Sequence, residues 1–381
     1  MDSRCDTMWN YTLDPTGALI ELYSKFDTVA IGILMPLLMF FGIIGNLAFL
    51  LMLCRVPKMR SLTNFYLANL AISDIAFLVF AVSTKLYDFC IGKVNFSPTT
   101  KGVFECLFRQ LVVDVSYFAS LFVISLVSLE KYYAICKPIR HRVISSWDRT
   151  VKLIACSWVV SVLIAISVIP SYSVIEYMCF VWPEEEQYAD LLSVYTWCVA
   201  TGHLAASYAN ALQTVPFFIA FILNTTMYVL IVRRLSQRAD QPIGQQEAVP
   251  VPDQAIHTRN QVAKMLVING SVFFLLLAPF EIVSIVISAY ALEYEQELLI
   301  LQICRLLSYL NSVINPFLFG MVNSRYRDAY KQAFLPARGN RVGAAPAPVP
   351  GLPAAEQPIS QPSVATCNNK HGDQSTSQQA Q

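Results

Sequence analysis

Seven apolar stretches follow one another along this chain, and each is about long enough to cross a lipid bilayer. A helix rises ~1.5 Å per residue and the hydrocarbon core is ~30 Å thick, so ~20 apolar residues span it. A soluble protein rarely combines 55% hydrophobic with 14% charged residues. We therefore predict an all-α integral membrane protein, a bundle of seven transmembrane helices over residues 28–54, 62–88, 104–136, 151–170, 201–232, 262–290 and 298–321.

Charged residues differ in sign between the two sides of the predicted bundle. Lysine and arginine gather in the first, third and fifth connections and after the last helix, as at Arg60, Arg140 and Arg234. Acidic residues gather at the amino terminus and in the fourth and sixth connections, as at Asp14, Glu185 and Glu295. By the positive-inside rule the basic side is cytoplasmic. We expect a multi-pass plasma-membrane protein with its amino terminus outside and its carboxyl terminus inside.

The chain divides into three predicted parts. Residues 1–27 form an outward segment, 28–335 the membrane domain and 336–381 a cytoplasmic tail. The tail is rich in Ala, Pro, Ser and Gln, which cannot bury a core, so we expect it to be disordered. No apolar core precedes residue 28, so a cleaved signal peptide is not expected.

Two inner segments differ from the spanning helices. Residues 239–255 contain several prolines and a glycine and predict a flexible loop. Residues 323–335 are amphipathic, with Tyr326, Tyr330 and Phe334 on one face. This pattern predicts a short eighth helix along the inner membrane surface.

Short motifs on the predicted outer side indicate glycosylation. Asn10 begins an Asn-Tyr-Thr acceptor, and Asn95 begins an Asn-Phe-Ser acceptor that is weaker because Pro98 follows it directly.

Cysteines on the same side indicate disulfides, because that compartment is oxidising. Cys106 begins the third helix, and Cys179 lies in the long loop before the fifth. A further bridge could come from others nearby, and the sequence does not fix the pairing: Cys5, Cys90, Cys198 and Cys304.

Polar side chains inside the predicted helices are costly in hydrocarbon, so each is a functional hypothesis. Asp74 lies in the middle of helix two and cannot stay ionised without partners. Oxygen atoms gathered around it would suit a small hard cation such as Na⁺. A neutral hydrogen-bonded knot between helices is the alternative. The other members of this group are Ser120, Asn311, Ser312 and Asn315.

A set of motifs occurs in order, one per helix or loop: Gly45-Asn46, Asn69-Leu70-Ala71 before Asp74, Cys106, Glu130-Lys131-Tyr132, Trp158, Cys179, Pro216, Pro279 and Asn315-Pro316. Over residues ~28–335 this set resembles the rhodopsin-like G-protein-coupled receptors. The resemblance implies a Cys106–Cys179 disulfide. It also implies that the polar group around Asp74 lines the family's sodium pocket.

Several activation motifs depart from the family pattern. Lys131 replaces the usual arginine and lacks its planar fork of donors. Leu277 replaces the toggle tryptophan, Phe319 the closing tyrosine, and Asn224 the partner tyrosine of helix five. The packing trio survives as Leu121, Pro216 and Phe273. Activation is therefore expected to use altered contacts or to be less efficient.

Residues in the outer half of the predicted bundle indicate which class of ligand the protein binds. Val113 stands where amine receptors of the family carry aspartate, while Asp114 is acidic, as in receptors resembling those for neurotensin, ghrelin and neuromedin U. Residues 64–71 also resemble kisspeptin and galanin receptors. Glu281 is expected to face the same pocket, with further predicted wall residues Gln110, Tyr117, His203, Phe280, Tyr290, Arg305 and Tyr309.

An acidic pocket favours a cationic ligand, and a peptide with Arg, Lys or a free amino group fits best. In the alternative, Asp114 pairs internally with Arg109 or Arg305 and leaves no charge free for a ligand.

The predicted function is a peptide receptor that acts through a heterotrimeric G protein. The alternative is a scavenger or an arrestin-biased receptor that signals weakly. A transporter or retinal pump is disfavoured, because helix seven has no lysine for a Schiff base. Nothing indicates an enzyme or a nucleic-acid partner, and no cofactor is expected beyond Na⁺. Arrestin is an expected partner, recruited by the hydroxyl-bearing tail at Ser360, Ser363, Thr366, Ser375, Thr376 and Ser377.

Overall fold

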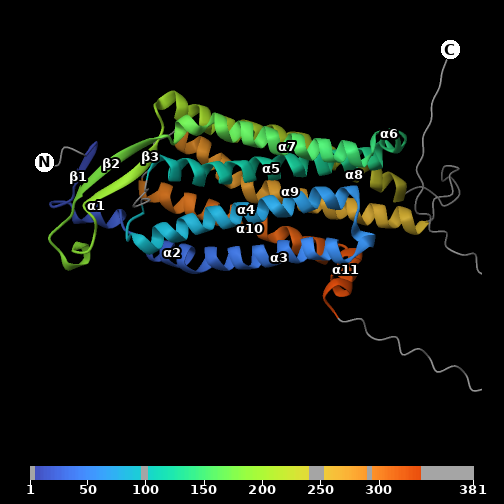
Figure 1. The fold of residues 1–381 in the computed structure, drawn as a ribbon, viewed down its shortest axis with the longest axis horizontal. Coiled ribbons are helices and arrows are strands. Elements are labelled where there is room, and N and C mark those ends of the chain that lie inside the picture. The colour runs from blue at the N-terminus through green and yellow to red at the C-terminus, as the bar shows by residue number, and fades with distance from the viewer. Residues whose placement is uncertain (1–4, 96–101, 240–252, 290–293, 336–381) are drawn as a thin grey trace, which may run out of the picture. The chain divides into compact units, whose positions relative to one another are not determined.

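A computed structural model describes residues 5–95, 102–239, 253–289 and 294–335. Within them, seven helices are long and apolar enough to cross a membrane (Figure 1). The first runs over Lys25–Arg55, and the others are α4 (Leu62–Ile91), α5 (Val103–Cys136), α7 (Trp147–Ser167), α8 (His203–Ala239), α9 (Asp253–Ala289) and α10 (Tyr294–Val322). The predicted seven-helix bundle is confirmed.

The first spanning helix joins three elements end to end: α2 (Lys25–Val29), a π-helical turn over Ala30–Leu34, and α3 (Met35–Arg55). Pro36 lies in the first turn of α3 and has no backbone N–H to donate. Serine side chains cap two later helices. Ser61 accepts from the Asn64 backbone at the start of α4, and Ser146 accepts from the Arg149 backbone at the start of α7.

The bounds of α9 differ from the prediction. The helix begins at Asp253 rather than at residue 262, because a polar turn outside the hydrocarbon can be helical without being apolar. Residues 240–252 of the predicted flexible loop lie outside the described residues, and so does the predicted disordered tail, 336–381.

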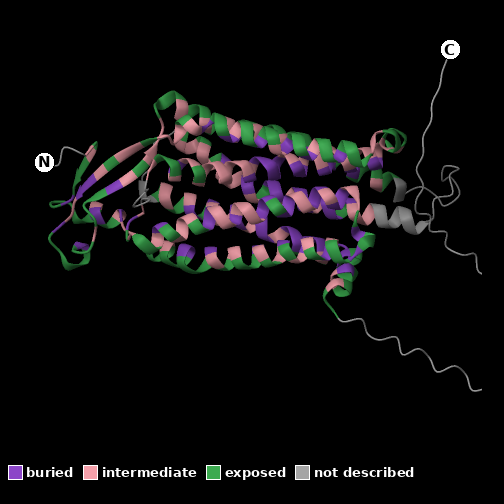
Figure 2. Ribbon diagram, in the orientation of Figure 1, coloured by how far each residue is buried: buried purple, intermediate pink, exposed green. Residues whose placement is uncertain are grey.

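Burial follows the faces that the helices turn toward one another (Figure 2). The largest core cluster includes Phe49, Leu121, Phe273 and Phe319. On the outward faces large apolar side chains are exposed, as at Phe40 of α3, which is 57% exposed. A soluble protein rarely exposes apolar patches of this extent, whereas lipid tails cover them without cost.

One end of the bundle carries a three-stranded sheet that the sequence did not predict. Strands β2 (Val174–Val181) and β3 (Val194–Val199) form an antiparallel hairpin, and β1 (Thr7–Asn10) joins β2 in parallel (Figure 1). Tyr11 stacks on Phe180 and Trp182, with the short helix α1 (Pro15–Ile20) following it in the chain. We call this end of the bundle the sheet end.

The opposite end carries α6 (Pro138–Ile144) and α11 (Ser324–Phe334), and we call it the α11 end. Helix α11 confirms the predicted eighth helix, and the Asn323 side chain caps it. Tyr326 is buried between Phe49 and Phe319, while Phe334 is exposed beneath the Arg55 guanidinium.

Candidate functional site

A cavity of about 330 Å³ lies among the helices at the sheet end. Most of the predicted wall residues line it: Gln110, Val113, Asp114, Tyr117, Phe280, Glu281, Arg305 and Tyr309. His203 does not, because it is exposed at the first position of α8. Tyr290 lies outside the described residues. The sequence missed a further group of wall residues: Phe77, Ala81, Thr84, Lys85, Arg109, Gln213, Leu277 and Ser308.

The Asp114 carboxylate is held by neutral donors. Gln110 Nε2 donates to Oδ1 at 3.0 Å, and the Tyr172 hydroxyl donates to Oδ2 at 2.9 Å. Burial and the nearby Asp114 charge raise the pKa of Tyr172, which keeps this donor protonated. Asp114 thus keeps its place without a cation from the described part of the chain.

Glu281 is arranged in the same way on the facing helix α9. It is 1% exposed, and its two oxygens accept from the Tyr117 hydroxyl at 2.8 Å and the Thr214 hydroxyl at 3.2 Å. Two carboxyl groups therefore stand at the α5 and α9 side of the cavity, each bonded to uncharged partners.

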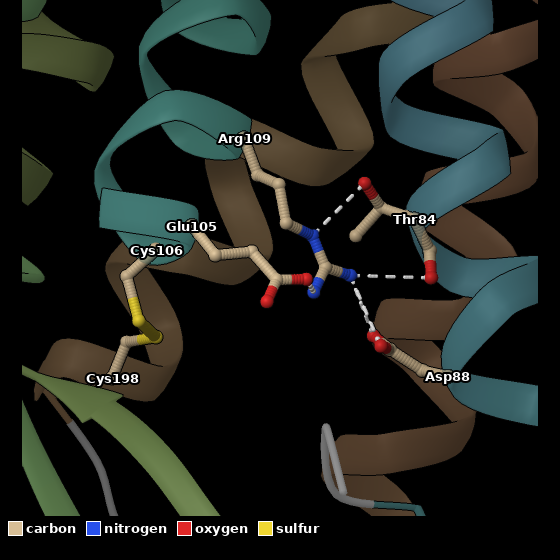
Figure 3. The surroundings of a disulfide bond; sticks show 6 residues. All are labelled: Thr84, Asp88, Glu105, Cys106, Arg109 and Cys198. Carbon is tan, nitrogen blue, oxygen red and sulfur yellow. Dashed lines mark hydrogen bonds and ion pairs between the residues drawn. A yellow bond between two sulfur atoms is a disulfide. The ribbon is translucent and has the colours of Figure 1, made fainter. Parts of the chain in front are cut away.

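Arg109 does not pair with Asp114, which contradicts the alternative of an internal ion pair with that residue. Its guanidinium points toward α4, where Nη2 lies 3.0 and 3.1 Å from the two oxygens of Asp88 (Figure 3). Glu105 and Thr84 complete its contacts. Arg305 contacts the neutral side chain of Gln302 rather than Asp114.

The disulfides correct the pairing that the family resemblance implied. Cys106 is bonded to Cys198 (Figure 3). Cys179 is bonded to Cys5, so the two disulfides leave no Cys106–Cys179 bridge. The hairpin register explains this, since Cys198 lies opposite Ile175 and four positions, or ~13 Å, from the level of Cys179. Of the two cysteines in the hairpin, Cys198 is the one bonded to α5.

Strand β1 accounts for the second bridge. Met8 pairs with Cys179 in the parallel register, which brings Cys5 alongside. Cys90 and Cys304, the other cysteines considered for pairing, are free thiols.

The two predicted glycosylation acceptors differ in their surroundings. Asn10 is exposed, and its Oδ1 accepts from the Thr12 hydroxyl at 2.7 Å. Asn95 instead uses Nδ2, the atom a glycan would modify, to donate to the carbonyls of Ile20 and Leu22. The structure therefore argues against a glycan on Asn95, while the one on Asn10 stays a prediction.

The polar group in the middle of the bundle is partly assembled as predicted. Asn315 Nδ2 donates to Asp74 Oδ2 at 2.8 Å, and Asn46 Nδ2 donates to the Ser312 carbonyl at 2.9 Å. The Ser120 hydroxyl lies 2.9 Å from Ser73 instead of bonding to Asp74.

Four buried oxygens of this group have no hydrogen-bond partner in the described part of the chain: Asp74 Oδ1, Asn46 Oδ1, Asn311 Oδ1 and Asn315 Oδ1. All four are acceptors. Acceptors without donors are the arrangement that a hard cation such as Na⁺ satisfies, so the residues fit that ion.

At the α11 end, the altered Glu130-Lys131-Tyr132 motif forms a closed network. Lys131 is buried, and its ammonium lies 2.7 Å from Glu130 and donates to the Thr63 hydroxyl of α4. His141 of α6 contacts the other Glu130 oxygen at 3.3 Å. Tyr132 lies beneath Lys137. The lysine thus holds α5 to α4 as a point charge.

The other switch positions lie along the core. Leu121, Phe273, Leu277 and Phe319 belong to one buried cluster, and the three prolines, Pro216, Pro279 and Pro316, lie inside α8, α9 and α10.

A tyrosine one turn from Asn224 places a hydroxyl in this region of the bundle. The Tyr228 hydroxyl lies 2.8 Å from Ser128 and donates to Asn224 Oδ1 at 3.4 Å. Asn224 Nδ2 in turn donates to Ser125. Nothing in the sequence distinguishes Tyr228 from the tyrosines that occur at the membrane–water interfaces of spanning helices.

Comparison with known proteins decides the family. A sequence model described as "7 transmembrane receptor (rhodopsin family)" matches residues 45–319, most of the chain. The chain belongs to the rhodopsin family of seven-transmembrane receptors. The resemblance drawn from the motifs is thereby confirmed, and this rhodopsin-family protein is a multi-pass membrane receptor and not an enzyme.

Similar receptors that match over most of their length support the assignment. The chain is 26% identical to the allatostatin-A receptor of Bombyx mori, over 85% of this chain and 84% of that protein. It is 27% identical to the thyrotropin-releasing hormone receptor of Gallus gallus, over 83% and 82%. It is 26% identical to the neuromedin-U receptor 2 of Mus musculus, over 81% and 76%.

Proposed function

We propose that this rhodopsin-family receptor binds a peptide carrying a positive charge and passes the signal to a heterotrimeric G protein. The sheet end then faces outside with the amino terminus, and the α11 end faces the cytoplasm at the plasma membrane. The names of the similar receptors and the basic connections at the α11 end support this orientation and ligand class.

One observation carries the ligand proposal. Asp114 and Glu281 line the same cavity and are bonded to neutral donors, so neither charge is neutralised by a basic side chain of the described residues. A buried carboxylate without a cation is costly in a low-dielectric site. A positively charged group of a ligand would remove that cost on binding.

A peptide-library screen on cells expressing the receptor tests the proposal, with G-protein dissociation as the readout. For a peptide that activates, Asp114→Asn and Glu281→Gln should each raise the half-maximal concentration about 10- to 100-fold, the value of a charge-assisted hydrogen bond. Asp190→Asn is the matched control, because that carboxylate is exposed and pairs with Lys93, which does not line the cavity. Unchanged potency in both cavity variants would refute the cationic-ligand proposal.

Arrestin recruitment, measured in the same cells, distinguishes G-protein signalling from the alternative of a scavenger or an arrestin-biased receptor. A scavenger would bind peptides without either response, and an arrestin-biased receptor would give the arrestin response alone. The observation that favours G-protein signalling is the intact helix-to-helix network at Asn224 and Tyr228, which retains a hydroxyl despite Phe319.

We also propose Na⁺ as an allosteric ion at Asp74. The four unpaired oxygens support it, and Asp74 supplies the negative charge. An ion that holds one arrangement of the bundle opposes a ligand that favours another, by linkage.

A further inference from the structure

The cavity has a basic side as well as an acidic one. Lys85 of α4, Arg109 of α5 and Arg305 of α10 all line it. Arg109 is neutralised by Asp88, which it contacts through both carboxylate oxygens, and by Glu105 (Figure 3). The charges of the other two basic side chains, Lys85 and Arg305, are not neutralised in this way.

Lys85 and Arg305 have no acidic partner at ion-pair distance in the part of the chain that the structure describes. Arg305 has only a long hydrogen bond of 3.5 Å, to the neutral Gln302 Oε1. Asp88 influences Lys85 electrostatically, but its two oxygens are already bound to Arg109. The positive charges of Lys85 and Arg305 also act on each other.

Two half-buried cations that repel each other are an unfavourable arrangement in a membrane protein. Charges in such a site are screened far less than at a surface, so the repulsion persists at physiological salt. An anion placed between them would offset both the repulsion and the missing hydrogen bonds. Lys85 lies on α4 and Arg305 on α10, and both helices border the same cavity.

We propose that Lys85 and Arg305 bind a carboxylate of the ligand. This inference rests on the proposed peptide receptor function and adds a second charge to it. The planar Arg305 guanidinium matches the two oxygens of a carboxylate, and the Lys85 ammonium adds a compact charge with three donors. With Asp114 and Glu281 on the α5 and α9 side, the cavity then takes a ligand with a cationic group at one end and a carboxylate at the other.

In a peptide the carboxylate comes either from the free C-terminus or from an Asp or Glu side chain. Three pools of short random-sequence peptides distinguish these sources. One pool has free C-termini and no Asp or Glu, a second is amidated and contains Asp and Glu, and a third is amidated and contains neither. Each pool is incubated with purified full-length receptor in phosphatidylcholine nanodiscs, and the retained peptides are measured by mass spectrometry.

The wild-type receptor should retain peptides of the first or second pool about tenfold or more above those of the third. The Lys85→Gln and Arg305→Gln variants should lose this preference while retaining third-pool peptides like the wild type. Lys93→Gln is the matched control, because its exposed ammonium lies outside the cavity and pairs with Asp190. It should keep the preference.

Equal retention of all three pools by the wild type would overturn the carboxylate site and leave the peptide receptor function standing. An undiminished preference in both cavity variants would do the same. Retention of no peptide from any pool would overturn the proposed peptide function and this inference with it.

Thermal unfolding of the variants without peptide shows whether they are folded, by comparing their unfolding midpoints with that of the wild type. Lys85→Gln should leave the unfolding midpoint unchanged or raise it, because it removes repulsion. A clearly lower midpoint would show that Lys85 stabilises the bundle by itself, and would overturn the assignment to a ligand.

Discussion

Replacing Gly270 by alanine should destabilise the bundle by displacing Tyr228. A Cβ at this position of α9 would overlap the Tyr228 hydroxyl and lie 2.5 Å from Cζ and 3.0 Å from Cε2 of its ring. Tyr228 is 7% exposed, and its hydroxyl is bonded to Ser128 at 2.8 Å. A ring is rigid, so the whole side chain must move and the hydrogen bond must break.

The expected loss follows from three contributions. Overpacking a dense interior costs about 1–3 kcal/mol, and the lost buried hydrogen bond about 1 kcal/mol. Alanine recovers about 1 kcal/mol through its better helix propensity. The net change is a loss of about 1–3 kcal/mol in the free energy of unfolding.

Thermal unfolding of the purified receptor measures this change. Gly320→Ala is the matched control, because its nearest neighbour atom outside its own helix belongs to Tyr330 at 3.8 Å, an ordinary contact. That variant should unfold at the wild-type temperature or above. Gly270→Ala should cost much less in a Tyr228→Leu background, which removes the ring. Equal costs in the two backgrounds, or a Gly270→Ala midpoint matching that of Gly320→Ala, would refute the reasoning.

The remaining predictions concern the disulfides, the switches and the tail. Cys198→Ala should abolish peptide binding at the cell surface, whereas Cys5→Ala should only weaken it, since it frees one strand and leaves the hairpin tied to α5; equal losses in a surface-binding assay would contradict this. Lys131→Arg should raise G-protein coupling, because a guanidinium reaches several acceptors at once; unchanged coupling at equal surface expression would show that the network has adapted to lysine. Na⁺ should weaken agonist binding, and Asp74→Asn should remove that effect; the same sodium dependence in the variant would place the ion elsewhere. Truncation after Leu335 should preserve ligand binding and reduce arrestin recruitment and internalisation; a full-length rate of internalisation would make the tail a spacer.

The sequence predicts the spanning helices well because the bilayer imposes a length and an apolar composition on each of them. The contact between Asp74 and Asn315 was predictable for a related reason, since polar groups in hydrocarbon must find one another. The position of Lys85 was not predictable. Helix α4 is apolar on most of its surface, so its rotation about its own axis leaves little trace in the sequence.

The disulfides were predicted incorrectly for a different reason. Their pairing depends on the register of β2 and β3 and on the approach of β1, which involve residues far apart in the chain. Strand signals in a segment of this kind are short, and a shift of a few positions changes which cysteine faces α5.

The bridge between Cys5 and Cys179 also bears on how the receptor is made. Its cysteines are separated by 174 positions, and four spanning helices are synthesised between them. At ~5–20 residues per second, the first strand waits roughly 10–35 s on the ribosome before its partner strand exists. With the amino terminus outside, as proposed above, Cys5 enters an oxidising compartment before Cys179 is made, and Cys106 does so before Cys198. Any Cys5–Cys106 bond formed in that interval would have to be reversed by thiol–disulfide exchange before the sheet can close.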